Sequence, residues 1–407
     1  MQMTHEFPVV KGLDVSTNHN FPFRMTAIGA VFLSGMGAAA YAQSGRSGAP
    51  QAPGAAVVKP NEQGELKMAQ ANPQMSAVLE KLDKLGAKPL GSQTAVDTRR
   101  GPSPADAVKA ILADQGKDPA ALMAQMNVKT VEMSYPTAGG VQKVRIYTPS
   151  VANQPVLPVI VYFHGGGWVI ADLDTYDASA RGLAQKTGAI VASVEYRHAP
   201  EHRFPAAHDD SIAAYRWVIQ NASSFGGDPR QLAVAGESAG GNLAMNVAIA
   251  ARDQKLQAPL HVLLVYPVAG TDMTTPSYKI NENAAPLSKR AMAWFVSQVL
   301  AKPSDASDAR LDLVGKANVA GLPPTTVIAA EIDPLMSEGK ALADKLAKAG
   351  VVMSYTAFAG VTHEFFGMAA VVGDADVAQN LAAKQLRDAF SANSQSQGEN
   401  APARARP

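Results

Sequence analysis

The sequence predicts an α/β fold, in which a mostly parallel sheet of eight strands carries helices on both faces. Residues 128–390 alternate short apolar runs, rich in Val, Ile and Ala, with segments of helical periodicity. This alternation is typical of parallel strands that are buried on both sides. Glycine-rich turns follow two of the apolar runs, at 164–168 and 236–240. These turns place the candidate functional residues at strand ends.

The eight strands are predicted from continuous or alternating apolar runs. Gly139-Gly140 joins the first two and suits a tight hairpin. Helices are predicted at 208–222, directly after Ser238, at 337–349 and at 374–390. The strands are expected at 129–135, 141–147, 158–163, 189–196, 231–235, 260–266, 325–330 and 351–358.

Two further segments are expected to form a helical cap over this core. Residues 74–127 carry apolar positions at helical spacing, interrupted at Lys88-Pro89 and Gly101-Pro102. An insertion at about 270–305 contains a helix predicted at 287–300. Residues 43–73 and 391–407 are rich in small and polar residues without periodicity, which predicts a disordered linker and a disordered tail.

The first 42 residues have the pattern of a secretory signal peptide. Lys11 and Arg24 precede an apolar stretch at 25–39, which ends in Ala40-Tyr41-Ala42. We expect cleavage after Ala42, a periplasmic or secreted mature protein, and no membrane span after cleavage. A short apolar N-terminal helix is the alternative, and the long region before the stretch leaves a start at Met25 open.

Composition excludes several functional classes. The 407 residues are 47% hydrophobic and 17% charged, as in globular proteins, and a net charge of +1 gives no support for binding nucleic acid or a membrane surface. The absence of cysteine excludes disulfides, thiolate catalysis and cysteine-bound metals.

Ser238 is the predicted nucleophile, because Gly236-Glu237-Ser238-Ala239-Gly240 is a G-x-S-x-G pattern between a strand and a helix. A Cβ at Gly236 or Gly240 would collide with the turn, so the two glycines leave room for a strained serine. Such a serine needs a base, an orienting acid and an oxyanion hole.

The base is predicted by elimination, since only two of the eight histidines follow Ser238. His261 lies within an apolar strand and reads as a core residue, whereas His363 lies in a turn after the last strand. Asp333 is the favoured acid because Pro334 ends the strand and fixes a turn. Glu331 and Asp272 remain alternatives.

A candidate oxyanion loop follows the third strand at His164-Gly165-Gly166-Gly167-Trp168. Consecutive glycines allow backbone N–H groups to approach a developing oxyanion closely. A phosphate-binding loop is disfavoured, because there is no G-x-G-x-x-G and no Gly-Lys-Ser/Thr after it.

Together, these motifs resemble the hormone-sensitive lipase family of α/β-hydrolase carboxylesterases over residues 75–390. The resemblance implies an α/β-hydrolase core under a helical cap and no metal or organic cofactor. It implies a triad of Ser238, Asp333 and His363, and an oxyanion hole made by the backbone amides of Gly165, Gly166 and Ala239. The motifs that carry it are His164-Gly-Gly-Gly-Trp168, Tyr196-Arg-His-Ala-Pro-Glu201, Phe225-Gly-Gly-Asp-Pro229, Gly236-Glu-Ser-Ala-Gly-Gly241, Asp333-Pro-Leu335 and His363-Glu-Phe365.

The chain departs from the usual family pattern at three positions near these motifs. Glu237 and Glu195 stand where aspartate is usual, and His198 stands where leucine is usual. None of the three is a triad position, but the longer carboxylates are expected to shift neighbouring loops.

Three rival functions are disfavoured. His198-Ala-Pro-Glu-His202 matches an inverted zinc-protease pattern, but Pro200 opposes the helical turn that this site needs. Ser337-Glu-Gly-Lys340 matches S-x-x-K, but its K-T-G partner at 186–188 precedes it and no S-D-N exists. A non-catalytic ligand receptor on the same fold is disfavoured because all three triad residues are present.

The sequence therefore predicts a serine carboxylesterase that acts on a small-molecule ester through an acyl-enzyme. We expect short acyl chains, because Trp168, Phe204 and Phe365 are bulky residues near the site and a cap is expected to enclose it. Amide or lactone cleavage and a homodimer are left open by the sequence.

Overall fold

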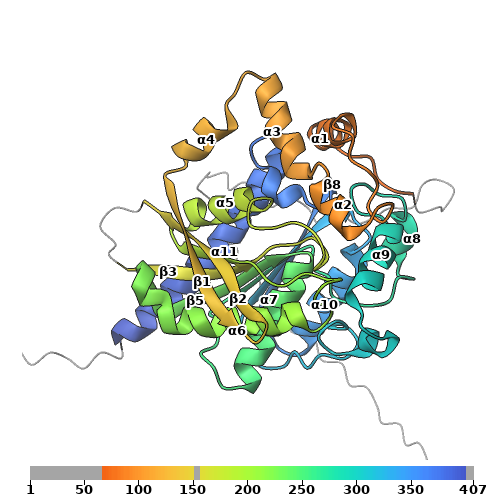
Figure 1. Cartoon of the computed structure of the whole chain (residues 1–407). Helices are drawn as coiled ribbons and strands as arrows, with labels where there is room; N and C mark the ends of the chain where they lie inside the picture. Colours follow the sequence, from red (N-terminus) through yellow and green to blue (C-terminus); the bar gives the residue numbers. More distant parts are fainter. Residues whose placement is uncertain (1–66, 151–155, 400–407) are drawn as a thin grey trace, which may run out of the picture. The chain divides into compact units, whose positions relative to one another are not determined.

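A computed structural model of the chain describes residues 67–150 and 156–399 (Figure 1). Its eight-stranded sheet has the order β1-β2-β4-β3-β5-β6-β7-β8. β2 runs antiparallel to both β1 and β4, and β3 to β8 are parallel to one another. The strands are β1 (Val128–Thr137), β2 (Gly140–Pro149), β3 (Leu157–Phe163), β4 (Ile190–Val194), β5 (Gly227–Glu237), β6 (Val262–Val265), β7 (Thr325–Ile332) and β8 (Met353–Thr362).

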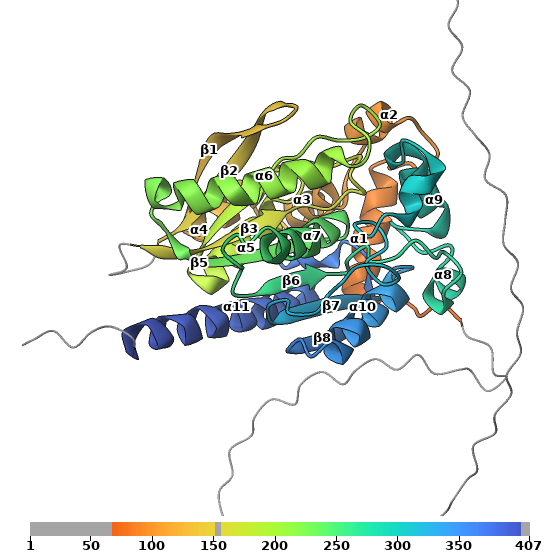
Figure 2. The ribbon, with the colours of Figure 1, turned by 90° about the horizontal axis from the view of Figure 1, so that it is seen from below.

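Helices cover both faces of this sheet, which confirms the predicted α/β architecture. One face packs against α6 (Ala206–Asn221), α7 (Ala239–Asp253) and α10 (Met336–Lys348). The other face packs against α5 (Asp177–Thr187) and α11 (Gly373–Glu399). Figure 2 shows α6 and α11 on opposite sides of the strands. Every residue of β4 and β6 is buried, as expected for strands covered on both sides.

Within residues 67–127, where the sequence predicts a helical segment, the structure has four helices before the sheet. They are α1 (Pro73–Lys84), α2 (Ala95–Arg100), α3 (Pro104–Asp114) and α4 (Pro119–Gln125). The Asn72 side chain caps α1, and Ser103 and Asp106 form a capping box on α3. Asn72 also donates a 2.8 Å hydrogen bond to Asp374, which ties the start of α1 to α11.

The insertion between β6 and β7 contains α8 (Pro276–Ile280), α9 (Lys289–Val299) and the 3₁₀ helix η2 (Pro303–Ser307). The remaining 3₁₀ helices are η1 (Ala222–Phe225) and η3 (Phe365–Met368). The side chain of Trp294 on α9 packs on Gly91, where a Cβ would lie 2.9 Å from the Trp294 Cβ. The insertion therefore contacts the segment that joins α1 to α2.

The end of the chain differs from the sequence prediction. α11 continues through 391–399, a range predicted to be disordered. Extending an existing helix costs far less than starting one, and Gln231 donates a 3.1 Å hydrogen bond to the Ser394 hydroxyl. The predicted signal peptide at 1–42, the predicted linker up to residue 66 and residues 400–407 lie outside the described residues. Within the described ranges, no helix combines the length and apolar character needed to cross a bilayer.

Candidate active site

Ser238 occupies the sharp turn between β5 and α7. Its backbone has φ 56° and ψ −119°, a strained conformation for a residue with a side chain. A Cβ on Gly236 would lie 2.1 Å from the Gly240 carbonyl oxygen, and a Cβ on Gly240 would lie 2.0 Å from the Phe163 carbonyl oxygen. Only glycine fits at either position, as the sequence predicts.

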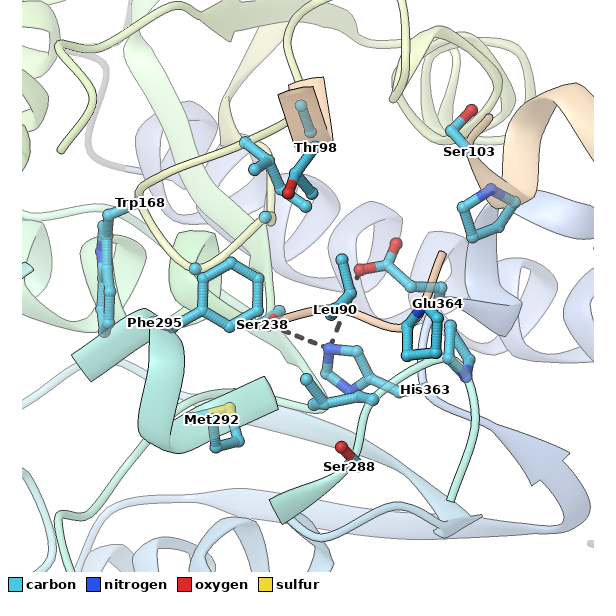
Figure 3. A pocket seen from close by; sticks show the side chains of 18 of the residues that line it. Leu90, Thr98, Ser103, Trp168, Ser238, Ser288, Met292, Phe295, His363 and Glu364 are labelled. Atoms are coloured by element: carbon cyan, nitrogen blue, oxygen red, sulfur yellow. Dashed lines mark hydrogen bonds and ion pairs between the residues drawn. The ribbon is translucent and has the colours of Figure 1, made fainter. Parts of the chain in front are cut away.

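The structure brings the predicted nucleophile, base and acid together. The Ser238 hydroxyl lies 2.9 Å from His363 Nε2 (Figure 3). His363 Nδ1 lies 2.7 Å from an Asp333 carboxylate oxygen. The relative exposures of these residues are 4%, 3% and 0%, so the hydrogen bonds are shielded from water. β8 runs to Thr362, further than predicted, and so presents His363 at the strand end.

The Asp333 carboxylate is fixed by the turn that Pro334 begins. Its second oxygen accepts a 2.8 Å hydrogen bond from the Leu335 N–H. The alternative acids have other partners: Glu331 accepts a hydrogen bond from the Gly360 N–H, and Asp272 accepts one from the Thr274 N–H in an exposed loop.

Electrostatics around His363 favour its protonated form. Burial is the largest single influence and acts to lower the pKa of His363, but the charge and hydrogen bond of Asp333 together with the nearby Glu364 and Glu237 carboxylates outweigh it, so the pKa is raised above its usual value. The Glu364 carboxylate lies 3.8 Å from His363 Nε2 and acts in the same direction. Both oxygens of Glu364 are within 2.7 Å of the Tyr176 hydroxyl, which holds this carboxylate in place.

The glycine-rich loop after β3 lies beside Ser238. A Cβ on Gly165 would lie 2.2 Å from the Tyr176 hydroxyl, and Gly166 has a φ of +90°, so the loop requires glycine. Within the described part of the chain, the backbone N–H groups of Gly165, Gly166 and Ala239 donate no hydrogen bond. Unpaired donors at the start of a helix and in an adjacent loop suit the stabilisation of an oxyanion.

A cavity of about 840 Å³ opens above Ser238 and His363. Both the α1–α3 segment and the insertion between β6 and β7 line it, so the helices predicted as a cap form its walls. A cavity of this volume is within the usual range for small-molecule sites. Its apolar lining includes Leu79, Leu82, Leu90, Trp168, Leu287, Met292, Phe295 and Val299.

Two of the three aromatic residues predicted to line the pocket do not line it. Trp168 lines the cavity. Phe204 instead packs against His208 and Arg310. Phe365 is fully buried between Tyr266 and Phe358. Glu364 has a φ of 73°, and this turn directs Glu364 toward the cavity while Phe365 begins η3 in the core.

Comparison with known proteins identifies the family. A family model of the α/β hydrolase fold matches residues 160–367. The carboxylesterase NlhH of Mycobacterium tuberculosis is 38% identical over 283 residues, which are 68% of this chain and 88% of the relative. The chain belongs to the hormone-sensitive lipase family of α/β-hydrolase carboxylesterases.

Other esterases are similar to this chain in sequence or structure. The ethyl acetate hydrolase of Pseudomonas putida is 36% identical over 236 residues, or 57% of this chain and 74% of the relative. The hyperthermophilic esterase of the archaeon Pyrobaculum calidifontis has a TM-score of 0.68 at 31% identity, covering 79% of this chain and 99% of that structure. The metagenomic carboxylesterase EstE1 has a TM-score of 0.65 at 33% identity, covering 74% and 98%.

The residues of the zinc-protease and S-x-x-K patterns, and the second candidate histidine, form structural contacts away from the triad. Glu201 forms a salt bridge with Arg99 in a turn, and His202 is exposed, so the H-x-x-E-H pattern does not form a helical zinc site. Lys340 pairs with Asp344 on the surface of α10. His261 hydrogen-bonds Thr326 in the core, as predicted.

Sequence reasoning missed the support behind the nucleophile. The Glu237 carboxyl group is buried and accepts hydrogen bonds from the hydroxyls of Tyr162 and Tyr266. Burial raises the pKa of Glu237 to about 7, and the two tyrosine hydrogen bonds oppose that rise. The position of Glu237 before Ser238 was visible, but its tyrosine partners come from β3 and the end of β6, and no local pattern in the sequence links them.

Proposed function

We propose that this carboxylic ester hydrolase cleaves short-chain acyl esters by a serine mechanism. Ser238 is the nucleophile, His363 the general base and then acid, and Asp333 the residue that orients His363. The observation that carries the proposal is the hydrogen-bonded series from the Ser238 hydroxyl to the Asp333 carboxylate, at 2.9 and 2.7 Å, on the floor of the cavity.

In the acylation step, His363 Nε2 takes the proton of the Ser238 hydroxyl while the Ser238 oxygen attacks the ester carbonyl carbon. Asp333 keeps the proton on His363 Nδ1, so that Nε2 is free to accept, and it stabilises the imidazolium that forms. The N–H groups of Gly165, Gly166 and Ala239 donate to the carbonyl oxygen as it becomes negative. Each such donor contributes about 3 kcal/mol in the transition state.

The tetrahedral intermediate then collapses. His363 Nε2–H gives its proton to the leaving alkoxide, and the acyl group stays on Ser238 as an ester. A water molecule repeats the cycle: His363 removes its proton, the oxygen attacks the acyl carbon, and Ser238 regains its hydroxyl as the acid leaves. The enzyme thereby returns to its starting protonation state and charge.

The short-chain preference rests on two features. Trp168 and Phe295 line the cavity close to the glycine loop, and a Cβ on Gly167 would lie 2.3 Å from Phe295 Cδ1. The Pseudomonas putida relative is named an ethyl acetate hydrolase, and ethyl acetate has a two-carbon acyl group. Phe204 and Phe365 lend no support, because neither lines the cavity.

The test is a panel of p-nitrophenyl esters from acetate to palmitate, run beside the matching anilides and a lactone, on wild type and Ser238→Ala. We expect kcat/KM to be highest for short esters, and Ser238→Ala to lower kcat by about 10⁴-fold or more. Rates that rise from butyrate to palmitate would contradict the chain-length preference. Faster turnover of anilides or the lactone would make the enzyme an amidase or lactonase, and binding without turnover would make it a receptor.

We also propose that the chain is exported, on the signal-peptide pattern of residues 1–42. Expression of the full chain followed by cell fractionation and N-terminal sequencing tests this. A mature protein that begins at Gln43 outside the cytoplasm supports export. An intact N-terminus in the cytoplasmic fraction contradicts it.

A further inference from the structure

Two histidines and a glutamate converge directly behind the glycine loop. His164 begins that loop, and Glu195 and His198 lie in the segment after β4. One ligand atom from each side chain lies within 4.8 Å of the other two. Among the residues that the structure describes, this is the one group of three or more His, Asp or Glu side chains that are this close.

Each of the two imidazoles in this group has a buried nitrogen atom without a hydrogen-bond partner. His164 is fully buried, and its Nδ1 lies 2.9 Å from the Gly165 carbonyl oxygen. Since a carbonyl only accepts, Nδ1 carries a proton, and in the neutral imidazole the lone pair is then on Nε2. Nε2 of His164 and Nε2 of His198 are both buried without a hydrogen-bond partner. A buried nitrogen with no partner is costly, and this cost calls for an explanation.

The separations suit one small divalent cation. Glu195 Oε1 lies 3.7 Å from His164 Nε2 and 3.4 Å from His198 Nε2. Ligands about 2.1 Å from a tetrahedral zinc ion lie roughly 3.4 Å from one another. The two histidine nitrogens are at most 4.8 Å apart, so they need to approach by no more than about 1.4 Å to reach this spacing. His198 is partly exposed, so rotation of its ring can supply this movement.

We propose that His164, Glu195 and His198 bind a zinc ion. Two imidazoles and one carboxylate are a ligand set that zinc uses, and the hydrogen bond from His164 Nδ1 to a backbone carbonyl is the arrangement that orients metal-binding histidines. Glu195 and His198 line the cavity, so water has access to the fourth position. The zinc ion has no part in the Ser238 mechanism.

Zinc at this position joins the glycine loop to the segment after β4. A ligand that binds the folded state but not the unfolded state stabilises the folded state, so zinc should raise the Tm of the protein. The effect should be the same in Ser238→Ala, which keeps all three ligands. Zinc binding and ester hydrolysis can therefore fail or succeed independently.

The test uses the full chain without an affinity tag, treated with a chelator and then desalted. Calorimetric titration with Zn²⁺ should give one ion per chain, and Co²⁺ should give the d–d absorption bands of a four- or five-coordinate site. Glu195→Gln and His198→Leu should each weaken zinc binding by about tenfold or more and remove the Tm increase. His202→Ala removes an exposed histidine outside the group and should bind as wild type does.

Absence of stoichiometric binding in wild type overturns the proposal. So does binding that survives in both Glu195→Gln and His198→Leu, or that is lost in His202→Ala. If the ligand variants do not fold, X-ray absorption at the zinc edge of the wild-type complex decides: two imidazole ligands support the site, and fewer overturn it.

Discussion

The Glu237 carboxyl group accepts a 2.6 Å hydrogen bond from the Tyr162 hydroxyl, directly behind the nucleophile. Tyr266 donates to the other carboxyl oxygen, and the Tyr266 ring lies 4.5 Å from the His363 ring, centroid to centroid. Glu237, at the end of β5, therefore links β3 on one side to the end of β6 on the other, where the Tyr266 ring packs against His363. It does not touch the cavity, so we assign it a positioning role.

We predict that Glu237→Gln lowers both stability and turnover. A glutamine side chain has one accepting oxygen, so one tyrosine hydroxyl loses its acceptor in a buried site, at a cost of about 1–3 kcal/mol. Movement of Tyr266 should lower kcat more than it changes KM. Urea unfolding and steady-state kinetics measure the two effects.

Glu338→Gln is the matched control for this prediction. Glu338 is equally buried, and burial raises its pKa to about 8, but one of its oxygens has no hydrogen-bond partner. The other oxygen accepts from the Ala269 N–H, a bond that glutamine can keep. A loss of stability as large as that of Glu237→Gln would show that the tyrosine pair is not the cause.

The convergence of Ser238, His363 and Asp333 was predictable because each residue carries a local signal at a strand end. Gly236 and Gly240 mark the strained serine, Pro334 marks the turn at Asp333, and His363 follows the last apolar run. In a parallel sheet such strand ends meet at one edge, so positions far apart in the sequence converge.

The pocket lining was only partly predictable, because the direction of a side chain depends on backbone angles that composition does not reveal. The positive φ of Glu364 decides that Glu364 faces the cavity and Phe365 the core. Phe295 was missed as a pocket residue, since the helix around it could be predicted but its contact with Gly167 could not.

The pH dependence of hydrolysis should report the environment of His363. The base must be neutral to accept the Ser238 proton, and the pKa of His363 is raised above 6.5, chiefly by Asp333 against the effect of burial. We therefore expect kcat/KM to fall as the pH drops through a value above 6.5. The measurement is a kcat/KM profile with p-nitrophenyl acetate.

Asp333→Asn tests the cause of that shift. Removing the carboxylate charge leaves burial in place, so the acid limb of the residual activity should move to lower pH, and kcat should drop by about 10⁴-fold. Glu331→Gln is the control, because Glu331 accepts a hydrogen bond from the Gly360 N–H and does not contact His363. An unmoved limb in Asp333→Asn would contradict the assignment of the acid.

Gly166→Ala should damage catalysis more than binding. The new Cβ would lie 2.1 Å from the Ile170 carbonyl oxygen, so the loop must shift and carry the Gly166 N–H away from the oxyanion. We expect kcat to fall by about 10²- to 10³-fold with a smaller change in KM. Gly226→Ala is the control: its φ of +83° imposes similar backbone strain, but nothing lies within 4 Å of the added Cβ. Equal losses of kcat in the two variants would mean that strain alone explains the effect.

Phe295→Ala should widen the cavity beside the glycine loop and extend the range of acyl chains. Its ring fills space next to Gly167, and removing it opens room without touching Ser238 or His363. The ratio of kcat/KM for octanoate over butyrate p-nitrophenyl esters should therefore rise, because each added methylene that becomes buried contributes about 0.8 kcal/mol. Trp294→Ala removes an aromatic ring from the same helix on the side that packs on Gly91, and it should leave this ratio unchanged. If both variants raise the ratio equally, looser packing of α9, and not the volume of Phe295, sets the chain-length preference.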